Sequence, residues 1–398
     1  MMTEDFSQLT LRRYPLTTDK TLKAWNAADE YILSHIDDTI SKDLNLINEN
    51  SNILVINDQF GALCCSLSKY YLLNKIVCWT DSFLSKTAIQ LNLSENNTKE
   101  YCKQYFNHIN QTTHNFPKEI QFDLVVIRIS KHNSLLEFQL KSLLPHINSN
   151  TKIIAAGMTK EIHNSNIKLF EKIIGETTTS LAKKKARLIF STPENNSSHL
   201  TDLLLDKGAV SYQNSDLKII GLPGVFSRVC LDIGTRVLLN YMPQTNPNET
   251  LIDLGCGTGL LGVLAARQNS QLSVIFTDES FLAVESAKHT YFENIDSTSN
   301  ASTNPQFITT DVLDGLDNNV ADHILCNPPF HQQNVQTLSI ANKMFKESAQ
   351  KLKTHGELRV VANRHLKYKP MLSSYFNEVR VISNDPKFIV WLAKKPKT

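Results

Sequence analysis

The residues Asn327, Pro328, Pro329 and Phe330 give the clearest chemical signal in this sequence, because they directly follow the apolar run HILC. The side-chain oxygen of Asn327 and the carbonyl oxygen of Pro328 can both accept hydrogen bonds from one NH₂ group. Proline fixes its own φ and restricts the residue before it, so the two acceptors are held in place. Phe330 can stack on a planar π system. The pattern predicts a clamp that orients a planar amino group; a proline-rich strand end with a core phenylalanine is the alternative.

A glycine-rich turn gives the second signal, in the stretch TLIDLGCGTGLLG. It lies between the apolar run 251–254, which we expect to be a strand, and a helical pattern from residue 260. Glycine allows close approach of a ligand and positive φ, and a helix N-terminus favours negative charge. Nicotinamide and flavin sites use related turns. Asp253 suits a cationic amino group better than a pyrophosphate, so the stretch resembles the S-adenosylmethionine (SAM) site of class I methyltransferases. The expected SAM ligands here are Asp253, Gly255, Cys256, Gly257 and Gly259.

Acids at the ends of the next two strands complete the expected cofactor site. Asp278 and Glu279 end the run VIFTDE, and a carboxylate there can accept hydrogen bonds from both ribose hydroxyls. The alternative for Asp278 is helix capping, for which Ser280 is the better candidate. The same resemblance places Asp311 beside the adenine ring, although Asp314 could compete for that place.

Phe226 lies in the segment GVFSR, ahead of the apolar run 251–254. It could close over the cofactor, or it could be an ordinary packing residue; the sequence favours neither.

The two halves of the chain resemble each other, at an offset of 197 to 199 residues. The stretch ILVINDQFGALCCSL, from Ile53, matches LIDLGCGTGLLGVLAA, from Leu251. A second pair begins at Val77 and Val274, and a third at Phe122 and Ala321. Each half alternates short apolar runs with helical patterns, which is typical of βαβ units around a parallel sheet. We therefore expect an α/β fold of two tandem class I (Rossmann-like) methyltransferase domains, residues 1–195 and 196–398, of which the first is degenerate.

Composition limits the other possibilities. The 398 residues are enough for two domains, and the net charge of +2 does not by itself indicate nucleic acid. The chain has no apolar run long enough to span a bilayer and no signal-peptide pattern, so we expect a cytoplasmic protein. The seven cysteines show no metal-ligand spacing; we expect buried free thiols and no metal.

The segments GVFSR, DLGCGTG, FTDES and CNPPFHQ, in this order, resemble the ribosomal RNA guanine-N2 methyltransferases. The resemblance extends to LTLRRYPLTTDKTLKAWNAADEYIL near the start, LFEKIIGETTTSLAKKKARLI in the middle and ANRHLKY from Ala362, which favour the large-subunit members. It implies SAM-dependent methylation of the exocyclic N2 of one guanine in 23S rRNA, naked or in a large-subunit precursor. The flipped-out base would contact Asn327, Pro328, Pro329 and Phe330, and Asn327 would also line the cofactor. No obligate protein partner is implied.

The first half keeps the apolar strands but loses the site residues. Val55 stands at the place of Asp253, and Arg128 to Lys131 stand at the place of the Asn-Pro-Pro-Phe motif. Only the ribose acid remains, as Asp81. We expect this half to contact RNA phosphates through local basic groups, although surface lysines are often merely solvated. These residues are Arg12, Arg13, Arg128, Lys131, Lys183, Lys184, Lys185 and Arg187.

Three other functions fit parts of the sequence. A small-subunit guanine-N2 methyltransferase shares the architecture. A protein-glutamine or adenine-N6 methyltransferase shares the Asn-Pro-Pro-Phe motif. An RNA-binding assembly factor without catalysis would fit if the second half resembled the first, but Asp253, three glycines and Asn327 occur together in it.

Overall fold

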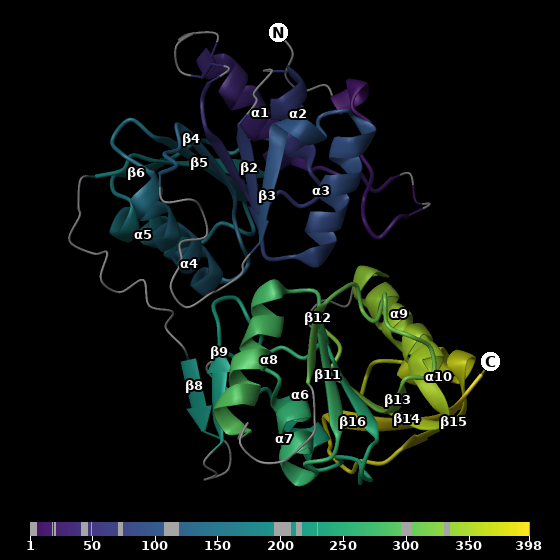
Figure 1. Ribbon diagram of the computed structural model, residues 1–398. Helices are drawn as coiled ribbons and strands as arrows, with labels where there is room; N and C mark the ends of the chain where they lie inside the picture. The colour runs from purple at the N-terminus through teal and green to yellow at the C-terminus, as the bar shows by residue number, and fades with distance from the viewer. Residues whose placement is uncertain are drawn as a thin grey trace. The chain divides into compact units, whose positions relative to one another are not determined.

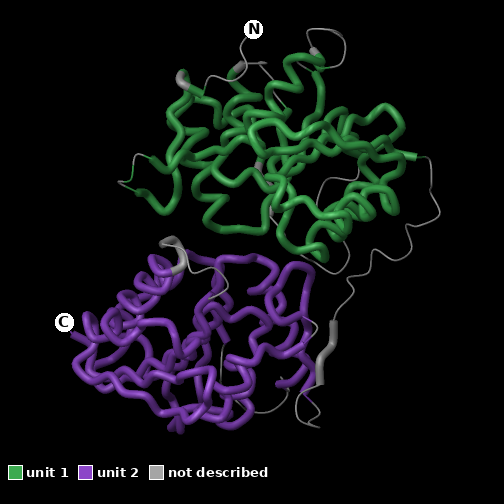
Figure 2. The backbone as a smooth tube through the Cα atoms, turned by 180° about the vertical axis from the view of Figure 1, so that it is seen from behind, with its two compact units in different colours: residues 1–205 green, residues 206–398 purple. Residues whose placement is uncertain are grey.

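The computed structural model describes the chain except residues 1–5, 18, 20, 41–46, 49, 71–74, 107–118, 195–207, 212–216, 229, 296–304, 330–334 and 398. The chain divides into two compact units, Met1–Leu205 and Asp206–Thr398 (Figure 2). The predicted boundary between residues 195 and 196 lies outside the described residues.

Unit 1 is built on one seven-stranded sheet with the order β3-β2-β1-β4-β5-β7-β6 (Figure 1). The first five strands are parallel, and β6 and β7 are antiparallel additions. The strands are β1 (Ile53–Ile56), β2 (Ile76–Thr80), β3 (Cys102–Phe106), β4 (Leu124–Arg128), β5 (Lys152–Met158), β6 (Thr177–Thr179) and β7 (Ala186–Ser191). The helices are α1 (Ala27–Ile40), α2 (Ala62–Tyr70), α3 (Phe83–Glu95), α4 (Asn133–Leu143) and α5 (Asn164–Ile173), with 3-10 turns at Phe6–Gln8, Lys99–Tyr101 and Leu144–His146.

Unit 2 repeats this architecture, with the strand order β12-β11-β10-β13-β14-β16-β15 and a separate ribbon of β8 and β9. The strands are β8 (Gly208–Ser211), β9 (Lys218–Gly221), β10 (Thr250–Leu254), β11 (Ser273–Asp278), β12 (Gln306–Thr309), β13 (Ala321–Cys326), β14 (Leu352–Asn363), β15 (Phe376–Val381) and β16 (Phe388–Pro396). The helices are α6 (Ile233–Leu239), α7 (Leu260–Gln268), α8 (Phe281–Asn294), α9 (Val335–Lys351) and α10 (Tyr368–Tyr375).

The two sheets share their strand register as well as their order. Ile56 pairs with Trp79 in unit 1, and Leu254 pairs with Thr277 in unit 2, at a common offset of 198 residues. The predicted α/β fold of two tandem Rossmann-like units is therefore confirmed. The central strands form near-continuous apolar runs because helices cover both faces of such a sheet.

Burial follows from this layering. All four residues of β1 are buried, as are all five of β2 and the last four of β10. The seven cysteines are free thiols; six are buried as expected, and Cys230 is exposed. Among the described residues, no helix combines the length and the apolar composition that crossing a bilayer requires.

Candidate active site

Asn327 follows β13 at the carboxyl edge of the unit 2 sheet, where open α/β sheets bind their ligands. Its side-chain nitrogen Nδ2 donates hydrogen bonds to Thr235 Oγ1 at 2.8 Å and to Asp232 Oδ2 at 3.2 Å. Its side-chain oxygen Oδ1 is buried and has no hydrogen-bond partner among the described residues. A buried acceptor of this kind is costly unless a ligand satisfies it. The amide therefore presents an acceptor, not a donor, to whatever binds here.

The N-terminus of α6 fixes the two partners of Asn327. Asp232 is the N-cap of this helix, and its Oδ2 also accepts the backbone N–H of Thr235 at 3.0 Å. Ser227, which has a φ of 63°, accepts the backbone N–H of Asp232 at 2.8 Å and donates to the carbonyl of Cys230. Ser227 in the loop before α6 thus positions Asp232, and Asp232 in turn orients the side-chain amide of Asn327.

Sequence reasoning missed Asp232 and Thr235 as functional residues. They lie 95 and 92 residues before Asn327, so only the fold brings them together. The pattern Asp-x-x-Thr at the start of a helix indicates a cap, but it does not indicate what else the cap contacts.

The other residues of the clamp differ in exposure. Pro328 is buried and Pro329 is exposed. Phe330 lies outside the described residues, so its expected stacking role stays a prediction.

The glycine turn connects β10 to α7. Gly255, Gly257 and Gly259 all have positive φ, at 69°, 52° and 77°. A Cβ added to Gly257 would meet only the carbonyl of Phe226, at 3.8 Å, so there is open space above this part of the turn. A Cβ on Gly259 would instead lie 2.7 Å from Ala287 of α8, which explains this glycine by close helix packing. Gly257 therefore faces a ligand space, whereas Gly259 joins two helices.

Asp278 ties the glycine turn to the end of β11. Its Oδ2 accepts the backbone N–H of Gly257 at 3.0 Å, and its Oδ1 accepts that of Ser280 at 3.0 Å. Ser280 is the N-cap of α8, as predicted. Burial raises the pKa of Asp278, although the backbone N–H groups oppose this shift. Glu279 is exposed. The half-buried carboxylate of Asp278 has further lone pairs that can accept hydrogen bonds from hydroxyl groups, and its expected contact with the ribose stays a prediction.

Asp253 lies in the core at the end of β10, with 1% of its surface exposed. Its Oδ2 accepts the backbone N–H of Gly262 in the first turn of α7, at 2.9 Å. Burial, reinforced by the charge of Asp278, raises the pKa of Asp253 to about 7. A buried carboxylate with so high a pKa favours a cation as its partner.

Asp311 forms an ion pair that the sequence did not predict. Its Oδ2 lies 2.6 Å from Lys343 Nζ, which also lies 3.2 Å from Asp314 Oδ2 and 3.3 Å from Glu347 Oε1. Burial opposes the charge on Lys343, but the bond to Asp311 outweighs it and raises the lysine pKa. Asp311 is buried, whereas the side chain of Asp314 is 52% exposed. The expected place of Asp311 beside the adenine ring stays a prediction.

Phe226 is 44% exposed, on the loop whose carbonyl faces Gly257. Phe226 is therefore not a fully buried core residue, and its expected place over the cofactor stays a prediction. The residues that could hold SAM thus fit its chemistry: Asp253 for a cationic amino group, Asp278 for hydroxyls, and an open glycine turn.

The structure corrects one expectation for unit 1. Ser82 caps α3, and its backbone N–H donates to Thr80 Oγ1 at 3.2 Å. In unit 2 the equivalent cap Ser280 donates to Asp278 Oδ1. Thr80 therefore stands at the place of Asp278, and the expectation that Asp81 preserves the ribose acid is wrong. The sequence aligned two Thr-Asp pairs that differ by one position in the fold.

Another acid in unit 1 takes over a contact of Asp253. Asp58 is buried in the degenerate turn, and its Oδ2 accepts the backbone N–H of Cys64 at 2.9 Å. Cys64 stands where Gly262 stands in unit 2. Asp58 therefore bonds to the first turn of α2, as Asp253 bonds to the first turn of α7. It does so from a position three residues after Val55, which stands at the place of Asp253.

Asn57 and Phe60 of the degenerate turn contact residues elsewhere in unit 1. The side-chain amides of Asn57 and Gln139 exchange hydrogen bonds of 2.8 and 3.1 Å, and Asn57 has a φ of 61°. The Arg13 guanidinium lies 4.7 Å above the ring of Phe60. The side chain of Asn57 thus has hydrogen-bond partners within unit 1.

Arg128 stands at the place of Asn327 and bonds to an acid in the same way. Its Nη1 lies 2.5 Å from Asp29 Oδ1 on α1, as the Asn327 amide bonds to Asp232 at the start of α6. The Arg128 side chain is only 12% exposed. The Arg128 side chain is therefore paired inside unit 1, and this does not favour the predicted contact with RNA phosphates.

The other predicted RNA contacts of unit 1 differ in exposure, and Arg13 is half-buried. Arg12 pairs with Glu95 at 3.3 Å and remains 58% exposed. Lys184 pairs with Glu30 at 3.0 Å. Arg187 is half-buried. The exposed lysines are Lys131, Lys183, Lys184 and Lys185.

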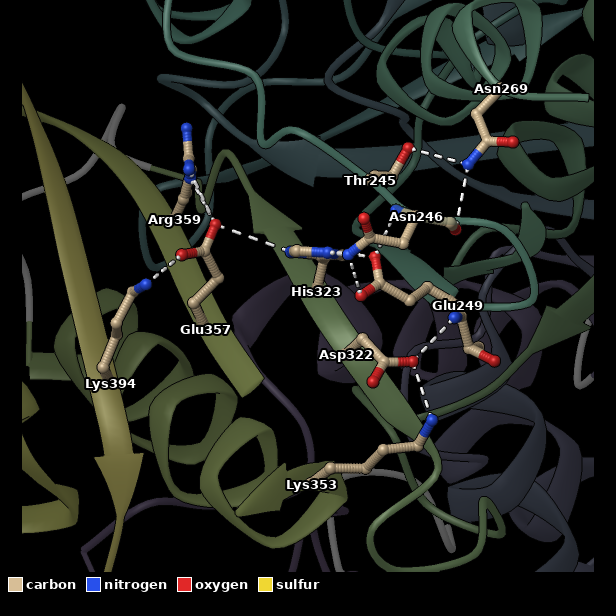
Figure 3. Close-up of polar contacts among 11 residues, drawn as sticks. Thr245, Asn246, Glu249, Asn269, Asp322, His323, Lys353, Glu357, Arg359 and Lys394 are labelled. Atoms are coloured by element: carbon tan, nitrogen blue, oxygen red, sulfur yellow. Dashed lines mark hydrogen bonds and ion pairs between the residues drawn. The ribbon is translucent and has the colours of Figure 1, made fainter. Parts of the chain in front are cut away.

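A separate charge network lies at the amino edge of the unit 2 sheet, away from the site (Figure 3). His323 lies 3.0 Å from Glu249 Oε2 and 3.5 Å from Glu357 Oε1. Arg359 and Lys394 also pair with Glu357, at 2.7 and 2.9 Å. This network joins β13, β14 and β16 and serves stability. The described residues contain no group of three or more His, Cys, Asp or Glu suited to a metal.

Comparisons with known proteins cover nearly the whole chain. Residues 1–195 match the family model of the RLMG N-terminal domain, and residues 216–392 match that of the methyltransferase small domain. A Vibrio vulnificus (strain YJ016) protein named ribosomal RNA large subunit methyltransferase G is 36% identical over 98% of this chain and 97% of its own length. A protein of the same name from Aliivibrio salmonicida (strain LFI1238) is 38% identical over 97% of this chain and 96% of its own length.

A solved structure has the same fold. It is the T. thermophilus 16S rRNA N2 methyltransferase RsmC in complex with AdoMet and guanosine, with a TM-score of 0.68. The match covers 91% of this chain and 92% of that chain. At 19% sequence identity, it shows a shared fold and no more.

Proposed function

Because the chain belongs to the ribosomal RNA large subunit methyltransferase G family, it is a SAM-dependent rRNA methyltransferase, and we propose that it methylates the exocyclic N2 of one guanine in 23S rRNA. The product is N2-methylguanosine. The substrate is 23S rRNA, naked or in a large-subunit precursor, in the cytoplasm.

The unpartnered oxygen of Asn327 carries this proposal. Both hydrogens of the Asn327 amide are directed at Asp232 and Thr235, and Oδ1 is left as a buried acceptor. An amino group such as guanine N2 supplies the donor that this oxygen lacks, whereas a carbonyl oxygen such as guanine O6 would face it with like partial charge. The site therefore selects an NH₂ group.

The chain supplies orientation rather than a strong base. Asn327 Oδ1, together with the Pro328 carbonyl, holds the N–H bonds of the target so that its lone pair faces the incoming methyl group. When bound, SAM would supply the methyl group from its sulfonium and would leave as the thioether, and N2 would release one proton to water or a carbonyl. The same acceptors stabilise the positive charge that develops on N2. Asp253, Gly255, Gly257 and Asp278 would bind the cofactor.

Unit 1 would contribute affinity for the RNA backbone. The unit presents positive charge that can contact phosphates. The residues are Arg12, Arg13, Lys131 and the lysines of the hairpin between β6 and β7, which are Lys183, Lys184 and Lys185. Reversing the three hairpin charges to Glu should weaken rRNA binding and flatten its salt dependence. Unchanged binding across several salt concentrations would remove the hairpin from the RNA interface.

Mass mapping of rRNA nucleosides tests the function. Cells that lack the protein should lose one N2-methylguanosine from 23S rRNA, and expression of the intact chain should restore it. Loss of a methyl group from 16S rRNA, from adenine or from a protein glutamine would instead identify one of the alternative substrates.

A further inference from the structure

A group of basic residues lies at the same edge of the unit 2 sheet as Asn327. Strand β14 is paired with β13 through Cys326 and Val360, so both strands end at this edge. Strand β16 runs the other way and begins here, with Phe388 opposite Asn363. The turn after β14 and the turn before β16 therefore flank the clamp. The exposed basic residues of these turns and of the first turn of α10, here called the edge basic surface, are Arg364, His365, Lys367, Lys369 and Lys387.

Buried aromatic residues connect this surface to the clamp. Tyr368 is buried between Lys367 and Lys369; burial, with the nearby thiol of Cys326, raises its pKa. Cys326 directly precedes Asn327. Phe388 also lies near the site. A Cβ atom added to Gly234 would lie 3.4 Å from the Phe388 ring and 3.6 Å from Asn327 Oδ1, so both side chains border the same glycine. The basic residues are thus neighbours of residues that line the clamp.

The edge basic surface keeps its charge. The Arg364 guanidinium donates to the backbone carbonyls of Pro386 and Asp385, so it is oriented by neutral acceptors. Asp385 lies two residues before Lys387, and its Oδ1 accepts two backbone N–H groups of the turn. Among the described residues, Lys367 and Lys369 form no ion pair. The surface therefore has a net positive charge although the whole chain is nearly neutral.

Helix stability does not explain these lysines. Lys367 is the N-cap residue of α10 without a side-chain capping bond, and Lys369 lies in the first turn, which contains no acid. The helix dipole disfavours positive charge at this end, by roughly 0.3–1 kcal/mol for each residue. Helix capping and the helix dipole therefore do not account for these two lysines.

We propose that the edge basic surface binds the backbone phosphates of the RNA strand that carries the target base. This inference rests on the proposed function, because it takes RNA as the substrate. A base that enters the clamp leaves its own phosphates at the carboxyl edge of the sheet, where Lys367, Lys369 and Arg364 are exposed. Each phosphate contact releases counterions, so it contributes about 0.7 to the slope of log K against log salt for a single strand.

The test compares two double variants of the full chain with a 23S rRNA transcript as the probe. Lys367→Gln with Lys369→Gln removes two charges from the edge basic surface. The control, Lys395→Gln with Lys397→Gln, removes two exposed charges at the opposite edge, where β16 ends. Binding is measured at several salt concentrations, together with melting temperature and SAM affinity.

The proposal expects the first variant to bind rRNA several-fold more weakly, with a slope shallower by about one, while the control matches the wild type. Its melting temperature should be equal or higher, because two unfavourable helix charges are gone, so weaker binding cannot come from misfolding. Equal affinity and slope in the two variants would overturn the proposal. Binding needs no turnover, so this result is independent of whether N2-methylguanosine is the product.

Discussion

The side-chain nitrogen of Asn327 lies 2.8 Å from the hydroxyl oxygen of Thr235, on a different element 92 residues away. The same nitrogen bonds to Asp232, which caps the helix that carries Thr235. One helix start thus determines which way the Asn327 amide faces. The catalytic preference for an amino group depends on this choice, because a flipped amide would present donors.

Thr235→Val should lower kcat about 10- to 100-fold, because one of the two acceptors that fix the amide is lost. SAM affinity should stay near the wild-type value. Thr235→Ser keeps the hydroxyl and should restore most of the rate. Equal rates for the valine and serine variants, measured by methyl transfer to rRNA under saturating conditions, would show that the hydroxyl does not orient Asn327.

Asp232→Ser separates capping from orientation. Serine caps helices about as well as aspartate, so the melting temperature should change little. Its shorter side chain cannot reach Asn327 Nδ2, so kcat should fall about tenfold or more. A full rate in Asp232→Ser, or a loss of rate that merely follows a loss of folded protein, would contradict the orienting role.

Two alanine substitutions should distinguish the glycines of the turn. Gly257→Ala places a methyl group in open space and forces a positive φ on alanine; SAM affinity should fall at least tenfold, with about 1 kcal/mol of stability lost. Gly259→Ala brings its methyl group against α8 at 2.7 Å and should destabilise the fold by several kcal/mol. Calorimetry with SAM and chemical denaturation measure the two effects. A loss of SAM affinity confined to Gly259→Ala, with a large loss of stability confined to Gly257→Ala, would contradict these two roles.

SAM affinity should increase as pH rises through about 7. Burial keeps Asp253 protonated below its pKa of about 7, and only the ionised form attracts a cationic amino group. In the ligand-free protein the sign is opposite: a raised carboxyl pKa lowers stability as pH rises from the unfolded pKa near 3.8 towards 7. Titration calorimetry from pH 6 to 8 measures the affinity. The Asp253→Asn variant should bind SAM weakly, and its affinity should change little with pH. If its affinity changed with pH as in the wild type, another group would be responsible for the pH dependence.

The network of Figure 3 should make folding sensitive to alkaline pH. Burial lowers the pKa of His323, but its bonds to Glu357 and Glu249 outweigh this and raise it. A raised histidine pKa stabilises the fold fully below the unfolded pKa, and the contribution is lost as pH rises through the folded pKa. His323→Gln should remove this loss of stability between pH 6 and 9, as measured by urea denaturation. The exposed His355→Gln is the control and should behave as the wild type.

The sequence predicted the two-unit fold and most elements around the site, because apolar runs, glycine turns and caps are local signals. It predicted Ser280 as a cap for this reason. It could not predict the partners of Asn327 or the ion pair of Asp311, because these depend on which elements the sheet brings together. It misplaced Asp81, because identical Thr-Asp pairs hid a shift of one residue that only the strand register shows.

Arg128 shows the same limit. Sequence reasoning treated it as a surface cation, whereas the fold places Asp29 beside it. Both units therefore use a residue at the carboxyl end of an equivalent strand, β4 or β13, to bond to an acid on or beside a helix, and Asn327 alone of the two keeps an oxygen for a substrate.

The most direct test is methyl transfer from labelled SAM to 23S rRNA by wild type and by Asn327→Ala, followed by mass analysis of the nucleosides. The wild type should yield N2-methylguanosine. Asn327→Ala should bind SAM with near wild-type affinity and yield about 100-fold less product or lower, because the acceptor for the amino group is gone. Undiminished N2-methylguanosine from Asn327→Ala, or label on another nucleoside in the wild type, would contradict the account.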